Sequence, residues 1–512
     1  MTLVLLTDLL TKNIKTFGEY PFLYFKNHSY SNLETLHYAE KGAAGLRHLG
    51  ISRGDRVIVC LPNMPEVIFS YQAIARIGAI IVPVMHLLHG KEIGYIAGHS
   101  EAKAVITSSE ILPKVKEGLS ESKRKPYIIT VDQVADDVIG FYELAALADG
   151  TESSGERDTG IDENETAVVL YTSGTTGKPK GVRLTHKNLY SNAESAAVNN
   201  KERGTTIGVL PLAHVYGLTT SNICFLTGSS MIIFSKFDVS KVFKAIETYK
   251  VRSFSAVPAM VHAMLSSSDS DLYDLSSLKK VSSGSAPMPL ALIRAFKEKF
   301  NADVLEGYGL SEAAPIVTAH REGLPYKPGS VGVPINGVDI RIVNEKGHEL
   351  PAGEIGELIV RGDNVTPGYF QNDEETKKVL KDGWLHTGDL ARADEDGYLY
   401  IVDRKKDLII RGGFNIYPRD LEELLISHHA VSEAAVIGVP DERMGEEVLA
   451  YVVKNPGFDI TEAELIQFCQ THLAKNKTPR KVIFIDALPR NSVGKVLKTK
   501  LRQLAEGVDL FS

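Results

Sequence analysis

Cysteine is scarce in this sequence, and its scarcity excludes two kinds of architecture. Only three cysteines occur in 512 residues, at positions 60, 224 and 469. Such wide spacing provides neither a clustered set of metal ligands nor a disulfide framework. We therefore expect a protein of a reducing compartment and predict a cytoplasmic location.

A large excess of positive or negative charge is also lacking. The 57 lysines and arginines nearly balance the 64 aspartates and glutamates, and the formal net charge is -7. The charges are interspersed, so there is neither the basic patch of a nucleic-acid-binding protein nor a polybasic membrane anchor, and no nucleic-acid partner is expected. With 43% hydrophobic residues, the chain is long enough for two or more domains.

Long apolar runs are the third absence. The longest run, AIARIGAIIVPVMHLL, contains Arg76 and Pro83, which is typical of a buried helix followed by a strand and not of a membrane span. The opening MTLVLLTDLL has no basic region and carries Asp8. We interpret it as an amphipathic helix and not as a signal peptide.

Two familiar nucleotide-binding motifs are missing as well. Lys178 is followed by Pro179 and Lys495 by Val496, so neither lysine completes the Walker pattern GxxxxGK[ST]. The segment EGYGLSE does not contain GxGxxG. Both P-loop and dinucleotide-binding interpretations therefore lose support.

What is present is a regular alternation of strand and helix patterns. The strand-like DRVIVCLPN, the helical PEVIFSYQAIARIG and the strand-like AIIVPV follow one another, and the alternation continues to about Leu310. It predicts parallel sheets covered by helices. From Gly329 to about Val402, short alternating runs such as VDIRIV and GELIVRG predict antiparallel hairpins and a small β-barrel.

The last part of the chain has a pattern of its own, from about Arg404 onward. EAAVIGV, EVLAYVV and KVIFI are strand-like, and TEAELIQFCQTHL is a helix that opens with a capping box from Thr461 to Glu464. These elements predict a small α+β domain.

The stretch YTSGTTGKPKGV, from Tyr171 to Val182, concentrates glycines, hydroxyls and lysines between two strand patterns. Glycine weakens regular structure, so it is used where the backbone must approach something closely. Hydroxyls, backbone N–H groups and lysines together suit a polyphosphate. A solvated turn is the alternative that this stretch alone leaves open.

Five blocks together carry a resemblance to a known family. YTSGTTGKPKG, YGLSE, HTGDL, DRKKDLIIRGG and NSVGK follow in this order, and the chain resembles the adenylate-forming superfamily from about Tyr20 to about Lys500. That superfamily contains acyl-CoA synthetases, amino-acid-activating domains and beetle luciferases. PLAHVYGLT and GGFNIYPRDLEE look most like fatty acyl-CoA synthetases of bacterial type.

The resemblance implies an α/β fold. A large N-terminal domain would contain two parallel α/β sheet subdomains plus a small antiparallel β-barrel, followed by a small mobile α+β C-terminal domain. We divide the chain into an N-terminal adenylation domain (residues 1–402), a hinge at Asp403 and a C-terminal lid (residues 404–512). After rotation about the hinge, Gly412 and Gly413 would line the path of the CoA pantetheine arm. A turn with solvated charges is the alternative for Asp403.

The resemblance also implies an ATP- and AMP-binding set. The hydroxyl-rich loop would wrap the β- and γ-phosphates, Tyr308 would stack on adenine, and Asp389 would bind both ribose hydroxyls. Arg404 would reach the ribose or a phosphate, and Glu312 would hold Mg²⁺, which favours carboxylate and phosphate oxygens. The full predicted set is Thr172, Ser173, Gly174, Thr175, Thr176, Gly177, Lys180, Gly284, Ser285, Ala286, Tyr308, Gly309, Ser311, Asp389 and Arg404.

Lys495, Glu312 and His214 form the predicted catalytic set. Lys495 would bridge the substrate carboxylate and the α-phosphate, where an ammonium stabilises charge that builds up on the phosphorus oxygens. His214, Gly217 and Val257 would lie at the acyl pocket. His214 is also open to a plainer interpretation, a packed residue without acid/base duty.

We predict an AMP-forming acid–thiol ligase. A carboxylic acid and ATP would give an acyl-adenylate and pyrophosphate, and CoA would then displace AMP to give acyl-CoA. A medium- or long-chain fatty acid is the predicted substrate. The alternatives are aryl or short-chain acids, amino acids, a luciferase-like oxygenase and a binding protein without catalysis. The predicted partners are the acid, ATP, Mg²⁺ and CoA, with no membrane span, and a homodimer is left open.

Overall fold

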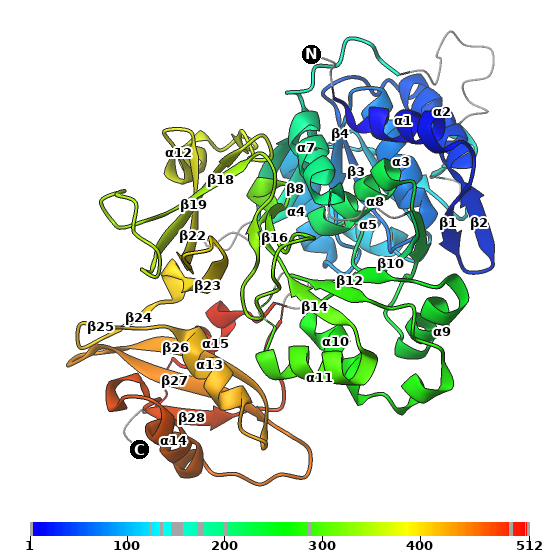
Figure 1. Cartoon of the computed structure of the whole chain (residues 1–512). Helices are drawn as coiled ribbons and strands as arrows, with labels where there is room; N and C mark the ends of the chain where they lie inside the picture. Colours follow the sequence, from blue (N-terminus) through cyan, green and yellow to red (C-terminus); the bar gives the residue numbers. More distant parts are fainter. Residues whose placement is uncertain are drawn as a thin grey trace.

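The computed structural model describes residues 4–122, 124–133, 137–144, 157–172, 179–198, 203–284, 286, 288–490, 495–506 and 508. In Figure 1 the first two thirds of the chain, blue to green, form the larger α/β part, and the C-terminal part, orange to red, lies beyond a yellow antiparallel sheet. The predicted α/β fold with parallel sheets, an antiparallel sheet and a C-terminal domain is confirmed.

The first subdomain is built on an eight-stranded sheet in the order β20-β9-β8-β4-β3-β5-β6-β7. Strands β3 to β8 run parallel, and β9 and β20 are added antiparallel. Alternate strand residues face two separate cores, one under α1, α2, α3 and α7 and the other under α4 and α5. The strands are β3 (Arg56–Cys60), β4 (Ile80–Pro83), β5 (Ala104–Thr107), β6 (Tyr127–Thr130), β7 (Ile139–Gly140), β8 (Thr166–Thr172), β9 (Lys180–Thr185) and β20 (Gly368–Tyr369).

The helices of this subdomain follow the predicted periodicity. The helix predicted from PEVIFSYQAIARIG is α3, and every one of its residues is buried. The predicted N-terminal helix is present from Leu6 onward. The helices are α1 (Leu6–Phe17), α2 (Asn32–His48), α3 (Pro65–Arg76), α4 (Gly90–Ser100), α5 (Leu112–Leu119) and α7 (His186–Ala197).

The second subdomain has two neighbouring sheets, β10-β11-β1-β2 and β12-β13-β14, which are parallel apart from β2. Their shared core continues from β10 into β12. The strands are β1 (Pro21–Phe25), β2 (His28–Ser31), β10 (Thr205–Gly208), β11 (Ser230–Ile233), β12 (Ser253–Ala256), β13 (Lys280–Ser283) and β14 (Asp303–Glu306), and the helices are α8 (Val215–Thr227), α9 (Val239–Tyr249), α10 (Pro258–Ser266), η1 (Ser268–Leu272) and α11 (Leu290–Phe300).

The predicted antiparallel segment is a curled sheet in the order β18-β19-β22-β21, with β23 on β22, next to a short β15-β16-β17 sheet. VDIRIV forms β18 and GELIVRG forms β19, as their alternation predicts. The elements are β15 (Tyr308–Gly309), η2 (Ser311–Ala313), β16 (Ile316–Ala319), β17 (Val333–Pro334), β18 (Val338–Val343), β19 (Gly356–Gly362), α12 (Asp373–Val379), β21 (Leu380–Lys381), β22 (Trp384–Ala393) and β23 (Leu399–Arg404).

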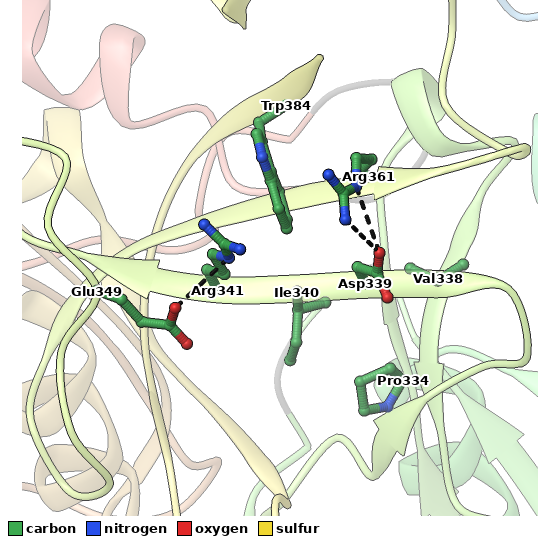
Figure 2. Close-up of a pocket in the computed structure, with 8 residues that line it drawn as sticks. All are labelled: Pro334, Val338, Asp339, Ile340, Arg341, Glu349, Arg361 and Trp384. Atoms are coloured by element: carbon green, nitrogen blue, oxygen red, sulfur yellow. Dashed lines mark hydrogen bonds and ion pairs between the residues drawn. The ribbon is translucent and has the colours of Figure 1, made fainter. Parts of the chain in front are cut away.

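One face of the curled sheet carries the single tryptophan of the chain. The guanidinium groups of Arg341 and Arg361 stack on the Trp384 ring, 4.7 and 4.6 Å from its centroid, and leave it 8% exposed. Asp339 pairs with Arg361 and Glu349 with Arg341 (Figure 2). The pocket there is lined by matched charges, so it does not present a net charge to a ligand.

The C-terminal part is a five-stranded sheet on which α13, α14 and α15 pack. Its order is β25-β24-β27-β26, with β28 parallel to β27. The predicted capping box is present, because the Glu464 N–H donates to Thr461 Oγ1 and the Glu464 carboxylate accepts from the Thr461 N–H. The elements are η3 (Lys405–Asp407), β24 (Ile409–Arg411), β25 (Phe414–Ile416), α13 (Pro418–Ile426), β26 (Val431–Asp441), β27 (Gly445–Lys454), α14 (Glu462–His472), η4 (Lys475–Lys477), β28 (Lys481–Phe484) and α15 (Lys498–Leu504).

Among the described residues, no helix combines the length and the apolar character needed to cross a membrane.

Candidate active site

The ends of two parallel strands form the base of the site. Ser283 at the end of β13 is paired with Glu306 at the end of β14, so Gly284 leaves the sheet beside Gly307, the residue that precedes Tyr308. The carboxyl ends of parallel strands are where ligands bind in open α/β sheets. Ala286 is exposed at the same edge, and Ser285 lies outside the described residues.

Tyr308 and Asp389 meet across two elements that are distant in sequence. Tyr308 Oη donates a 2.5 Å hydrogen bond to Asp389 Oδ2, and Asp389 is buried. Burial and the neighbouring carboxylate raise the pKa of Tyr308, so its hydroxyl stays protonated. Arg404 is the register partner of Asp389 in the neighbouring strand, and its Nε lies 3.5 Å from Asp389 Oδ1. These three predicted nucleotide-binding residues therefore form one group.

A second group contains Glu312 and Lys180. Tyr369 Oη donates to Glu312 Oε1 at 2.9 Å, and the Lys180 ammonium lies over the same ring, 5.7 Å from its centroid. Lys180 also forms an ion pair with Glu375 of α12. Tyr369 and Glu375 come from the segment around β20, which pairs with β9.

Lys495 reaches the site from the C-terminal part and is half-buried. Burial lowers the pKa of its ammonium, and the positive charge of Arg404 lowers it further. The carboxylates of Asp389 and Glu312 oppose that shift. Lys495 is therefore within electrostatic reach of both groups.

His214 is also within electrostatic reach of Lys495. It is the residue before α8, and its Nδ1 accepts the Tyr216 N–H at 3.3 Å. Burial and the neighbouring Lys495 charge lower the pKa of His214 to about 4. The imidazole is thus neutral near pH 7 and caps α8, which agrees with the plainer interpretation of a packed residue.

Close backbone contacts explain why two of the predicted site residues are glycines. A Cβ on Gly217 would lie 2.2 Å from the carbonyl oxygen of Pro211, and one on Gly309 would lie 2.0 Å from that of Pro315. Both positions therefore exclude side chains because backbone approaches them. Ser311 begins the turn η2 that carries Glu312.

The hydroxyl-rich loop connects two antiparallel strands, as predicted. Thr172 at the end of β8 is the register partner of Lys180 at the start of β9. Residues 173–178, which contain the predicted Ser173, Gly174, Thr175, Thr176 and Gly177, lie outside the described residues.

Gly412 and Gly413 form the turn between β24 and β25. Their φ angles are +58° and +82°, a region that favours glycine. Phe414 and Ile410 beside them are 59% and 52% exposed. The predicted hinge Asp403 lies within β23, opposite Leu390.

Comparison with known proteins identifies the chain. Residues 10–370 match the family model described as AMP-binding enzyme. The chain belongs to this family. Residues 420–495 of this AMP-binding enzyme match the model of the family's C-terminal domain, so both parts of the fold are accounted for.

The relatives of this AMP-binding enzyme include acid–CoA ligases. It is 37% identical to the long-chain-fatty-acid–CoA ligase of Bacillus subtilis, over 97% of this chain and 94% of the relative. It is 36% identical to 4-coumarate:CoA ligase 1 of Petunia hybrida, over 97% of this chain and 93% of that enzyme. The crystal structure of an anthranilate CoA ligase with anthranoyl-AMP superposes with a TM-score of 0.91 at 28% identity, covering 99% and 98% of the two chains. This enzyme is accordingly an ATP-dependent, AMP-forming acid–CoA ligase.

The residues around Glu312 fit a magnesium ion whose coordination shell is completed by phosphate oxygens. The described residues contain no cluster of three or more carboxylate, histidine or cysteine ligands. Mg²⁺ is usually held by one or two carboxylates together with substrate phosphates and water, so a single Glu312 suffices. Tyr369 and Glu375 could not be predicted from the sequence, because no motif connects them with Lys180 and only the β20–β9 pairing brings them close to it.

Proposed function

We propose that this ligase activates a medium- or long-chain fatty acid. The observation that carries the catalytic part of the proposal is the Tyr308–Asp389–Arg404 group, whose charges, together with that of Glu312, influence Lys495. A lysine so placed would bridge the acid carboxylate and the α-phosphate and stabilise the charge on the phosphorus oxygens.

In this proposal the nucleotide lies across the two groups described above. Tyr308 would stack on adenine, with Gly284 to Ala286 on the other side. Asp389, held by Tyr308 and Arg404, would accept the ribose hydroxyls. The loop from Thr172 to Lys180 would cradle the β- and γ-phosphates. Glu312 would hold Mg²⁺, which would neutralise the phosphate charge when bound.

The acid would enter beside α8. Neutral His214 and cationic Lys495 offer a carboxylate a positive environment, which disfavours the α-ammonium group of an amino acid. His214 and Val257, which precede α8 and α10, would border the acyl chain. The similarity to the Bacillus fatty acid ligase supports a fatty acid.

An aryl acid is the second candidate. Tyr216 Oη and Ser255 Oγ form a hydrogen bond of 3.2 Å next to this path, and Tyr216 follows His214 by two residues. A hydroxyl pair of this kind suits a phenolic acid, because a site built to bond a hydroxyl discriminates strongly against acids that lack it. The similarity to the petunia coumarate ligase is almost as high.

The second half-reaction would need a different docking of the C-terminal part. Residues 404–512 would rotate about Asp403. This rotation would move Lys495 out of the site and bring the hairpin of Gly412 and Gly413 into its place. The absence of side chains there would leave room for the pantetheine arm.

The test is pyrophosphate release over a panel of acids, with and without CoA. We expect saturated fatty acids to give the highest kcat/KM, and AMP and acyl-CoA to form only when CoA is present. Higher kcat/KM for 4-coumarate than for cinnamate, lost in Ser255→Ala, would favour the aryl candidate. Pyrophosphate release with amino acids, and with none of the fatty or aryl acids, would contradict both candidate substrates.

A further inference from the structure

Two side chains on one face of α4 reach both ends of the hydroxyl-rich loop. Tyr95 and His99 are spaced i and i+4, so they lie on the same side of the helix. Tyr95 Oη donates to the carbonyl oxygen of Pro179 at 3.3 Å. A hydrogen bond of 2.7 Å joins His99 Nδ1 and Tyr171 Oη. Tyr171 precedes residues 172–178 and Pro179 follows them, so α4 holds both ends of the segment.

His99 lies at the centre of a group of rings. Its ring centroid is 5.7 Å from that of Tyr95, 5.6 Å from that of Tyr171 and 6.1 Å from that of Phe370. The Phe370 N–H donates to the carbonyl oxygen of Gly181, which ties this ring to the strand after the loop. The ring group therefore contacts the strand before the loop and the strand after it.

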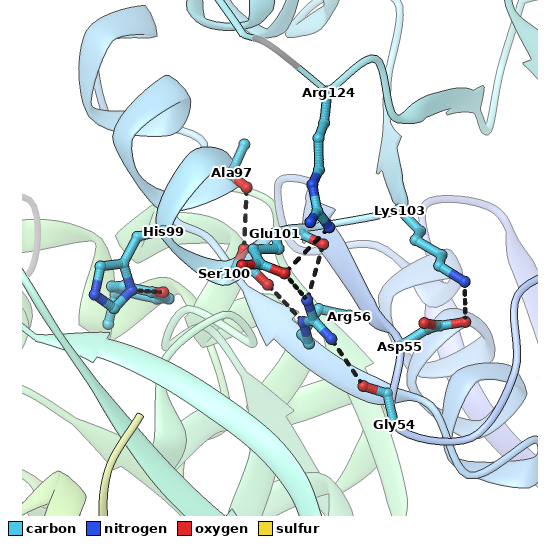
Figure 3. A network of polar contacts seen from close by, with 10 residues as sticks. Gly54, Asp55, Arg56, Ala97, His99, Ser100, Glu101, Lys103 and Arg124 are labelled. Carbon is cyan, nitrogen blue, oxygen red and sulfur yellow. Dashed lines mark hydrogen bonds and ion pairs between the residues drawn. The ribbon is translucent and has the colours of Figure 1, made fainter. Parts of the chain in front are cut away.

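Helix α4 is itself firmly held. A Cβ on Gly94 would lie 2.3 Å from the carbonyl oxygen of Gly118, so α4 and α5 are in direct backbone contact. At the carboxyl end of α4, Arg56 Nε donates to the carbonyl oxygen of Ser100 at 2.5 Å, and Arg56 also pairs with Glu101 (Figure 3). Sites built on anchored helices are positioned more accurately than sites on loops.

We infer that Tyr95 and His99 are positioning residues that hold Thr172 and Lys180 in place for ATP. Neither side chain would touch the nucleotide. They would act through Tyr171 and Pro179 on the adjacent Thr172 and Lys180. Binding groups that are fixed in advance reduce the free-energy cost of binding. The inference rests on the proposed function, because it assumes that Thr172 and Lys180 contact the β- and γ-phosphates.

The first test uses two variants that each remove one hydroxyl and keep the ring, Tyr95→Phe and Tyr171→Phe. Each should raise the KM for ATP about three- to tenfold, the effect expected from one lost hydrogen bond. The KM for the acid should stay unchanged. The rate of acyl-CoA formation from synthetic acyl-adenylate should also stay unchanged, because that step contains no triphosphate.

The second test separates the hydrogen bond of His99 from its packing. His99→Asn keeps a hydrogen-bonding atom near the position of Nδ1, and His99→Leu removes it. We expect the leucine variant to raise the KM for ATP and the asparagine variant to restore most of the loss. Lys91→Ala, an exposed change on the same helix, is the matched control and should leave every constant unchanged.

Lys180→Met separates the proposed phosphate contact from the proposed role of α4. If this variant leaves the KM for ATP unchanged, the assignment of Lys180 to the phosphates is wrong. If it raises the KM for ATP while the double variant Tyr95→Phe/Tyr171→Phe does not, only the role of α4 is wrong. If the double variant impairs the constants for ATP and acid equally, or slows the thioester step, the α4 residues act on general stability and the inference is overturned.

Discussion

The carboxylate of Asp403 connects the two sides of the proposed hinge, and removing it should change the balance of the two half-reactions. Asp403 Oδ2 accepts the Arg419 N–H at 2.9 Å. This N–H is in the first turn of α13, where helical amides have no partner within the helix. Asp403 Oδ1 accepts the N–H of Arg404, which follows it in the chain, at 2.7 Å. Of these two bonds, only the one to Arg419 crosses the hinge.

The expected magnitude follows from that single bond. A side chain that caps a helix N-terminus contributes about 1 kcal/mol. Rotation of the C-terminal part would break the bond, so Asp403→Ala should destabilise the present docking by about that amount. Since 1.36 kcal/mol corresponds to a tenfold change, the ratio of the adenylation rate to the thioester rate should fall about fivefold.

The assay measures both half-reactions on each purified variant, pyrophosphate release with acid and ATP, and acyl-CoA formation from synthetic acyl-adenylate. Glu423→Ala is the matched control, because Arg419 and Glu423 pair within α13 on one side of the hinge. Asp403→Pro additionally restricts φ, and relative to Asp403→Ala it should slow the thioester step at least about tenfold. An unchanged ratio in Asp403→Ala would refute the role of the carboxylate, and equal thioester rates in the alanine and proline variants would refute the hinge.

Three further outcomes are expected. Lys495→Ala should lose about a hundred- to thousandfold in pyrophosphate release and retain acyl-CoA formation from acyl-adenylate, and equal loss of both would contradict its assignment. Glu312→Gln should raise the Mg²⁺ concentration needed for half-maximal pyrophosphate release, because an amide is a poorer ligand for a hard cation, and an unshifted Mg²⁺ titration would exclude it as the ligand. Burial lowers the pKa of His186 from 6.5 to about 4, so the unfolded state binds more protons in this range. The free energy of unfolding in urea should therefore decrease by up to about 3 kcal/mol as the pH falls from 6.5 to 4, and His186→Gln should flatten that slope.

Local sequence patterns predicted the elements that position the site. The turn between β8 and β9, the strands VDIRIV and GELIVRG and the capping box at Thr461 all depend on neighbours within a few residues, and all are present. The resemblance then named Tyr308, Asp389 and Arg404, which the structure brings into contact.

Contacts between distant segments could not be predicted in this way. Lys180 pairs with Glu375, which is 195 residues away, and the pairing depends on β20 joining the edge of the sheet next to β9. Strand β20 has only two residues, which is too short to show a periodic pattern in the sequence. The contacts of Tyr95 and His99 could not be predicted either, because an aromatic residue and a histidine on one helix face usually indicate ordinary packing.

The stacked tryptophan gives the protein a built-in optical reporter. Because Trp384 is the sole tryptophan and lies in β22, the strand that also carries Asp389, indole fluorescence monitors the curled sheet and not residues 404–512. Far-ultraviolet circular dichroism monitors both parts. Coincident unfolding curves from the two signals would mean that the C-terminal part melts together with the sheet, and a circular dichroism transition that precedes the fluorescence transition would mean that it separates and unfolds first.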